Sequence, residues 1–181
     1  KRLYLSAVFD DEGSVGKSPY PYVILSRNIH IKFTKKEKKI LDKYVNCLMT
    51  DASFPTGHLM RMISIGLLRK SLEGKNSENM LCKILSSKPN ILIDESKLLK
   101  DEFNINNSIY VISLAQTPRG NYSIKSSLVI RNKKDIIKFC QEIGFSLSEK
   151  QIKLKEALDK VGWLEDRDKF IQYADQKKTS I

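Results

Sequence analysis

Apolar side chains recur along this chain at two different spacings, which separate helices from strands. Residues 2–12 carry them at helical intervals and stop before Gly13, so we expect a short helix that Gly13 caps in the left-handed conformation. Between residues 20 and 33, an apolar run at 22–25 is followed by alternating apolar and polar residues at 29–33, which predicts a strand hairpin with one apolar and one basic face. Later stretches predict strands at 108–114 and 122–130, and helices at 34–50, 58–72, 79–85, 94–103, 133–143 and 148–161.

These elements also predict a fold class. Without residues 51 to about 90, their order is helix, strand, strand, helix, strand, strand, helix, helix. That order predicts an α+β fold in which helices cover one face of a four-stranded antiparallel sheet. Residues 51 to about 90 then form a helical insert that packs as a small extra core or serves as a DNA- or partner-binding appendage, and residues 163–181 form a charged C-terminal tail. The uncovered face of the sheet should be polar and basic.

The charge balance indicates what this basic face contacts. The 181 residues are 41% hydrophobic and 29% charged, as in folded soluble proteins, and the net charge is +11. Such a charge favours polyanions, above all the phosphates of nucleic acid, although it also serves solubility. For double-stranded DNA, the expected contact residues are Lys17, Arg27, His30, Lys32, Arg119, Ser123, Lys125 and Arg131.

The cysteines indicate the compartment. Cys47, Cys82 and Cys140 are far apart in apolar stretches and show neither a disulfide pattern nor metal-binding spacing. We therefore expect three core residues of a cytoplasmic protein in a reducing environment. No stretch approaches the length of a membrane span, so no membrane partner is expected.

Three consecutive acids, Asp10, Asp11 and Glu12, stand at the end of the first predicted helix. Acids are unfavourable there because the C-terminus of a helix already carries partial negative charge. Carboxylates and backbone carbonyls at such a position suit a hard cation such as Mg²⁺. A solvated acidic turn is the alternative, since charged turns are usually exposed to water.

The stretch that contains these acids resembles a known motif. Residues 5–13 (LSAVFDDEG) are similar to the LAGLIDADG motif of homing endonucleases, and residues 13–15 (GSV) match its common continuation. Glu12 stands in the place of the last acid of the motif, whereas Asp11 stands where the family name has Ala.

A second stretch resembles the end of the same kind of domain. Residues 139–145 (FCQEIGF), followed by Lys150 and Leu154, are similar to the "IGF…K…L" ending of archaeal and intein members. The resemblance covers the chain except for residues 51 to about 90 and the tail. It implies a LAGLIDADG-type αββαββα fold for residues 1–162, with the insert inside it.

The resemblance also implies an activity: a site-specific DNA endonuclease that hydrolyses phosphodiester bonds with Mg²⁺ or Mn²⁺. On the positions that match, Glu12 and the carbonyl of Gly13 would hold the metal. Lys150 and Lys125 would assist catalysis beside Glu12, while Asp10 would be a structural or capping acid.

Only one acidic motif is present, whereas a complete site of this family needs two. Ser6 and Ala7 fall where the family uses small residues, which lets two such helices cross closely. We therefore expect either a homodimer with a near-palindromic target, or a chain whose Lys1 begins the second half of a longer two-motif protein.

Other functions stay open at this point. A DNA-binding regulator that does not cleave, or an RNA-splicing maturase, would keep the fold and the basic face without the site. A structural or interaction module with incidental charge is a third alternative. Two histidines are too few for a His-rich zinc site, and no GxxxxGK[ST] or GxGxxG loop supports nucleotide-driven chemistry.

Overall fold

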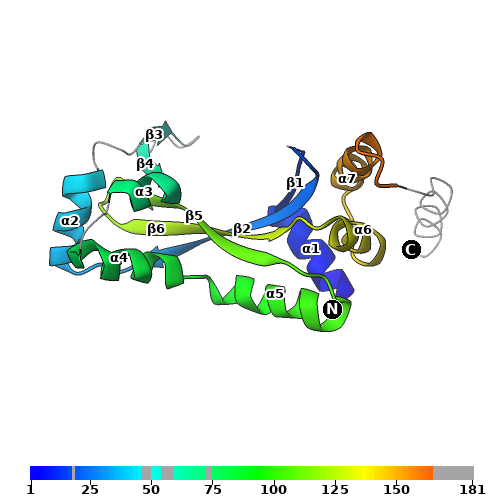
Figure 1. The fold of residues 1–181 in the computed structure, drawn as a ribbon, viewed down its shortest axis with the longest axis horizontal. Coiled ribbons are helices and arrows are strands. Elements are labelled where there is room, and N and C mark those ends of the chain that lie inside the picture. Colours follow the sequence, from blue (N-terminus) through cyan, green and yellow to red (C-terminus); the bar gives the residue numbers. More distant parts are fainter. Residues whose placement is uncertain (18, 46–49, 54–58, 72–74, 165–181) are drawn as a thin grey trace. The chain divides into compact units, whose positions relative to one another are not determined.

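The structure is a computed structural model that describes residues 1–17, 19–45, 50–53, 59–71 and 75–164 (Figure 1). The predicted charged tail lies outside the described residues from position 165 onward. The helices are α1 (Arg2–Glu12), α2 (Lys35–Val45), α3 (Ile65–Ser71), α4 (Lys75–Ser86), α5 (Asn90–Phe103), α6 (Lys133–Glu142) and α7 (Ser148–Lys160). The strands are β1 (Gly13–Gly16), β2 (Tyr22–Ile31), β3 (Thr50–Ser53), β4 (Leu59–Ser64), β5 (Ser108–Gln116) and β6 (Tyr122–Ile130).

The described strands form one six-stranded sheet in the order β1-β2-β6-β5-β4-β3. Three strand pairs with an assigned register are antiparallel: β1 with β2, β3 with β4, and β4 with β5. The predicted α+β class is confirmed. The predicted number of four strands is wrong for this sheet, because β1, β3 and β4 were not recognised as strands and the predicted hairpin at residues 20–33 is a single strand.

The first predicted hairpin, at residues 20–33, is one continuous strand. β2 passes through Arg27 and Asn28 without turning, and its hairpin partner is β1, where Val15 lies opposite Val23. A two-residue hairpin turn needs positive φ angles, which neither Arg27 nor Asn28 has. Gly13 does not adopt the predicted left-handed cap either: its φ of −83° and ψ of 158° are extended, because it already begins β1.

The insert is helical only in part. Residues 59–64 form β4 rather than the start of a helix, and β4 pairs with both β3 and β5. The six residues LMRMIS do not alternate strictly between apolar and polar, and a window this short does not separate a strand from a helix. As predicted, residues of the insert pack inward: Ile63 and Leu68 are fully buried, although Leu67 is exposed.

The chain divides into two compact units, each made of separate stretches. Unit 1 contains residues 1–25, 94–108 and 128 onward, and its buried apolar side chains include Leu5, Phe9, Phe139 and Leu154. Unit 2 contains residues 26–93 and 109–127. Its core consists of Phe33, Leu41, Ile63, Leu68, Met80, Ile84, Val111, Leu114, Tyr122 and Ile124.

Two further expectations are corrected by burial. Cys82 is exposed, whereas Cys140 is buried as predicted and Cys47 lies outside the described residues. β6 was expected to present a polar face, but every residue of it except Lys125 is buried. The reason is that β6 lies between β2 and β5 as an inner strand, and the Ser127 hydroxyl is 2.8 Å from that of Ser26.

Among the described helices, none has the length and apolar character that would let it cross a membrane.

Candidate active site

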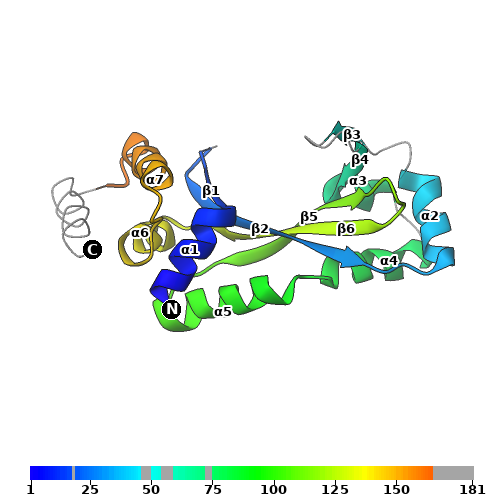
Figure 2. The ribbon, with the colours of Figure 1, turned by 180° about the vertical axis from the view of Figure 1, so that it is seen from behind.

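The acidic end of α1 lies in unit 1, next to β1 and to the turn that joins α6 to α7 (Figure 2). α1 is anchored there by Phe9, which is fully buried. The ring of Phe9 packs edge-on against Phe139 and Phe145, with centroid distances of 4.8 and 6.4 Å. Phe139 belongs to α6 and Phe145 to the α6–α7 turn, so this packing joins α1 to both.

Ser6 strengthens the same contact. Its hydroxyl donates to the Gly144 carbonyl at 3.2 Å and lies 2.8 Å from the Ser146 hydroxyl. Gly144 has a φ of +63°, which favours glycine, and a Cβ there would meet Gln151 Oε1 at 3.0 Å. The turn is thus fitted closely against α1.

The Asp10 carboxylate caps the start of α7. Oδ2 accepts from the Ser146 N–H at 3.0 Å and Oδ1 from the Leu147 N–H at 3.1 Å. Helix N-termini have unsatisfied N–H groups and partial positive charge, so a carboxylate is stabilised there. The expected structural or capping role of Asp10 is confirmed, and the helix that it caps is α7.

Lys150 makes the reciprocal contact from α7 to the end of α1. Its ammonium donates to the carbonyls of Phe9 at 3.3 Å and Gly13 at 2.7 Å, and also to that of Asp10. These carbonyls lie at a helix C-terminus, where the helix dipole favours positive charge. The positive charge at this helix end is therefore the Lys150 ammonium of the same chain.

Gly13 allows the backbone to pass close to the end of α1. A Cβ at this position would lie 2.5 Å from the Phe9 carbonyl oxygen and 2.9 Å from the Phe9 ring. Any larger residue would push β1 away from the helix. The result is that the Gly13 carbonyl points at Lys150.

Asp11 and Glu12 differ from Asp10 because both are exposed. No group of three or more His, Cys, Asp or Glu residues within the described part of the chain could hold a metal ion. At this helix end, the described residues offer a cation Glu12, Asp11 and backbone oxygens. Mg²⁺ in nucleic-acid enzymes is typically held by one or two carboxylates plus substrate phosphates, and two copies of this helix end would match that requirement.

The two residues predicted to lie at a helix interface, Ser6 and Ala7, differ in their exposure to solvent. Ser6 is 3% exposed and faces the α6–α7 turn, so its assignment to an interface with another helix is wrong. Ala7 is exposed. Neighbouring residues of a helix point about 100° apart, and the sequence alone did not indicate which of the two small residues faces the core.

The structure brings together only some of the other predicted residues. Lys150 and Gly13 meet at the end of α1, whereas Lys125 is exposed in unit 2. Of the residues predicted to contact DNA, the exposed ones are Lys17, His30, Lys32, Arg119, Lys125 and Arg131. Arg27 is half-buried, and Ser123 is 8% exposed, so the predicted contact from Ser123 is corrected.

Sequence reasoning missed the partners in this site. Nothing in the sequence pairs Ser6 with Gly144 or Asp10 with the amides of Ser146 and Leu147, because these contacts join residues more than 130 positions apart. The available signal was Gly144 itself, a helix-ending glycine just before a capping stretch.

Comparison of the chain with protein-family models, curated proteins and solved structures finds no match.

The cap made by Lys150 can be measured. Lys150→Met is expected to lower the free energy of unfolding by about 1.5–3 kcal/mol, the range for hydrogen bonds to a charged group. Lys153→Met is the matched control, since Lys153 is exposed on the same helix and its nearest acid, Glu149, is 4.0 Å away. Chemical denaturation should find the control within about 0.5 kcal/mol of the wild type. Equal losses in the two variants would contradict the cap.

Proposed function

We propose that this chain is a site-specific DNA endonuclease of the LAGLIDADG type, which uses a divalent metal at the acidic end of α1. The observation that carries the proposal is that the three acids at this helix end lie in different environments. Asp10 is bonded to the start of α7, while Asp11 and Glu12 stay exposed at a helix end that Phe9 and Lys150 hold in place. A rigid support beneath exposed carboxylates is what a metal site on a DNA surface requires.

The order of elements supports the LAGLIDADG-type fold. Without β3, β4, α3 and α4, the chain runs α1-β1-β2-α2-α5-β5-β6-α6-α7. This order contains two strand pairs, each preceded by a helix, with further helices at the end. The order matches αββαββα when α2 and α5 are taken together as the single helical segment between the two strand pairs, which the insert interrupts.

A second copy of α1 would complete the site. The exposed side of α1 carries Leu3, 84% exposed, and Tyr4, 48% exposed, together with Ala7. Asp11 follows on the same side, one turn beyond Ala7, so pairing through this stripe would bring two acidic ends near each other. The second copy belongs to a homodimer or to a preceding half of a longer chain. A bound metal would supply an activated water and stabilise the leaving oxygen of the phosphodiester.

The proposal is tested by incubating the wild-type chain with a library of randomised DNA duplexes. We expect double-strand cuts at a recurring sequence with Mg²⁺ or Mn²⁺ and none after chelation with EDTA. Cutting that persists in EDTA, or tight binding without cutting under all metal conditions, would contradict a metal-dependent endonuclease.

One observation favours a second candidate, a DNA-binding regulator or RNA-splicing maturase that does not cleave. The Gly13 carbonyl and the Lys150 ammonium were expected to serve the metal and catalysis, yet they bind each other at 2.7 Å. A helix end closed by its own lysine would suit a protein that keeps the fold and the basic surface for binding alone. The same assay separates the two candidates, because the binder retains affinity and never cuts.

The helix stripe gives a separate prediction. Leu3→Glu is expected to raise the dissociation constant of a homodimer at least about ten-fold, since it places a charge in the centre of an apolar contact. Leu3 is so exposed that the folded monomer should be unaffected. Sedimentation equilibrium measures the change, and Lys153→Glu, on the exposed side of α7, is the control. A wild-type chain that is monomeric at all concentrations would contradict the homodimer.

A further inference from the structure

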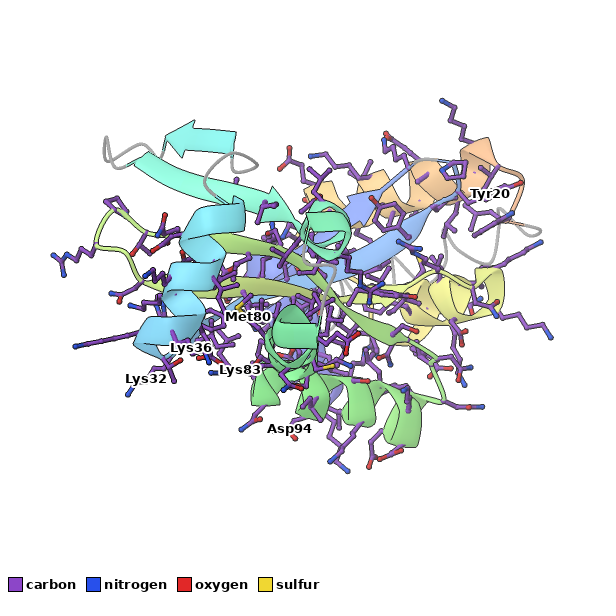
Figure 3. The ribbon with its side chains drawn as sticks, turned by 60° about the vertical axis from the view of Figure 1, so that its left-hand side comes forward. Tyr20, Lys32, Lys36, Met80, Lys83 and Asp94 are labelled. Atoms are coloured by element: carbon purple, nitrogen blue, oxygen red, sulfur yellow. The ribbon has the colours of Figure 1, made fainter. Side chains whose placement is uncertain are left out.

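Helix α2 in unit 2 carries a cluster of lysines that the proposed active site does not use. Lys35, Lys36 and Lys39 are exposed on it, and Lys32 is exposed just before it. Figure 3 shows Lys32 and Lys36 at the start of this helix. Lys35 and Lys39 are one turn apart on the same side, where like charges repel. Cations are also unfavourable near a helix N-terminus, so the isolated protein gains nothing from this arrangement.

The acids of α2 do not neutralise these lysines. Both Glu37 oxygens are 3.0 Å from Lys83 of α4, and Glu37 also accepts from the Thr34 N–H at 2.6 Å. The bond from the Thr34 N–H and the neighbouring Lys83 hold the pKa of Glu37 below its usual range. Asp42 accepts from the Tyr122 hydroxyl at 2.7 Å. Both acids thus serve to dock α2 within unit 2.

The lysines, in contrast, have no acidic partner in the described part of the chain. No ion pair joins Lys32, Lys35, Lys36 or Lys39 to another described residue. Lys38, on the flank of the helix, reaches the Gly120 carbonyl at 3.5 Å. Gly120 belongs to the β5–β6 turn, so the exposed Arg119 of that turn lies near the helix. We call Lys32, Lys35, Lys36, Lys39 and Arg119 the basic ridge.

The residue types of the ridge indicate which class of partner it binds. Two apolar residues of α2 whose side chains are described are used inside unit 2: Leu41 is fully buried in the core, and Ile40 packs against it. A helix that binds a membrane surface needs exposed apolar residues, and protein interfaces are rich in aromatic residues and poor in lysine. A row of exposed lysines and an arginine, on a helix whose described apolar side chains face the core, suits a polymer of phosphates.

We propose that the basic ridge is a second docking surface for the sugar–phosphate backbone of duplex DNA, separate from the acidic end of α1. The proposal rests on the proposed function only in that the chain must bind DNA. Contacts of this kind position a duplex without reading its sequence. The ridge would therefore add affinity on DNA of any sequence and leave the choice of target site to other residues.

The test is the salt dependence of binding to a fluorescein-labelled duplex of mixed sequence, measured by anisotropy. The variant replaces Lys32, Lys35, Lys36 and Lys39 with Gln. The control loses the same charge at Lys97, Lys100, Lys153 and Lys160, which are exposed in unit 1 and each have an acid within one helical turn. Each lost phosphate contact should make the slope of log affinity against log salt less negative by about 0.9.

We expect the ridge variant to change this slope by about two to four and to lose at least about ten-fold in affinity at low salt. The control should keep the wild-type slope. Circular dichroism should show both variants folded at the assay temperature, with the ridge variant no less stable than the wild type because it loses charges that repel one another. Equal slopes in the ridge variant and the control would overturn the proposal. So would loss of binding to vesicles that contain phosphatidylserine without any change on DNA.

The outcome is distinct from that of the cleavage assay. A changed slope in a chain that never cuts DNA would support the ridge and contradict only the endonuclease. Cutting of DNA with an unchanged slope in the ridge variant would support the endonuclease and contradict the ridge. A wild-type chain that fails to bind DNA even at low salt would overturn both.

Discussion

Phe9→Ala is expected to lower the free energy of unfolding by about 3–5 kcal/mol, the usual loss for a buried phenylalanine. Phe9 is fully buried and its ring touches both Phe139 and Phe145, so the truncation leaves a cavity between α1 and the α6–α7 turn. The turn cannot close this cavity freely, because Ser6 and Asp10 also hold it against the helix. Chemical denaturation of both proteins measures the difference.

Val8→Ala is the matched control on the same helix. Val8 is half-buried and adjacent to Phe9, so its truncation should lower stability by less than about 1.5 kcal/mol, in proportion to the smaller apolar area it buries. Similar losses in the two variants would mean that Phe9 does not anchor α1. The acidic end would then lack the rigid support on which the proposed site depends.

Helices with a long, regular apolar pattern were predicted well from the sequence. α1, α5, α6 and α7 lie within a few residues of their predicted ranges, because each shows apolar residues at helical spacing over about three turns. The β3–β4 hairpin was missed since its strands have only four and six residues. In such short stretches a period of two and a period of 3.6 are not distinguishable.

The chemistry of the site was predictable in part. The three acids at a helix C-terminus led us to predict a metal ion there, and this stays a prediction. The sequence did not indicate that Lys150 of α7 would place its ammonium on the carbonyls of this helix end, because only the fold brings α7 and α1 together. For the same reason it assigned Ser6 to a contact with another helix, although Ser6 bonds to the α6–α7 turn.

Glu12→Gln is expected to have the largest effect on activity. The change keeps the size of the side chain but removes the charge that binds a metal, so cleavage should fall at least about a thousand-fold, or about 4 kcal/mol of transition-state stabilisation. Stability should stay within about 0.5 kcal/mol, since Glu12 is exposed. Asp11→Asn is the control: Asp11 is also exposed, but it stands where the motif has no acid, and its loss should reduce cleavage less than about ten-fold.

The central claim is that the acidic end of α1 performs metal-dependent DNA cleavage. It is tested most directly by measuring single-turnover cleavage of a duplex selected by the wild type, with Mg²⁺, for the wild type, Glu12→Gln and Asp11→Asn. We predict cutting by the wild type and by Asp11→Asn, and none by Glu12→Gln, with equal DNA affinity for all three. Undiminished cutting by Glu12→Gln would place the active site elsewhere in the chain and contradict the account.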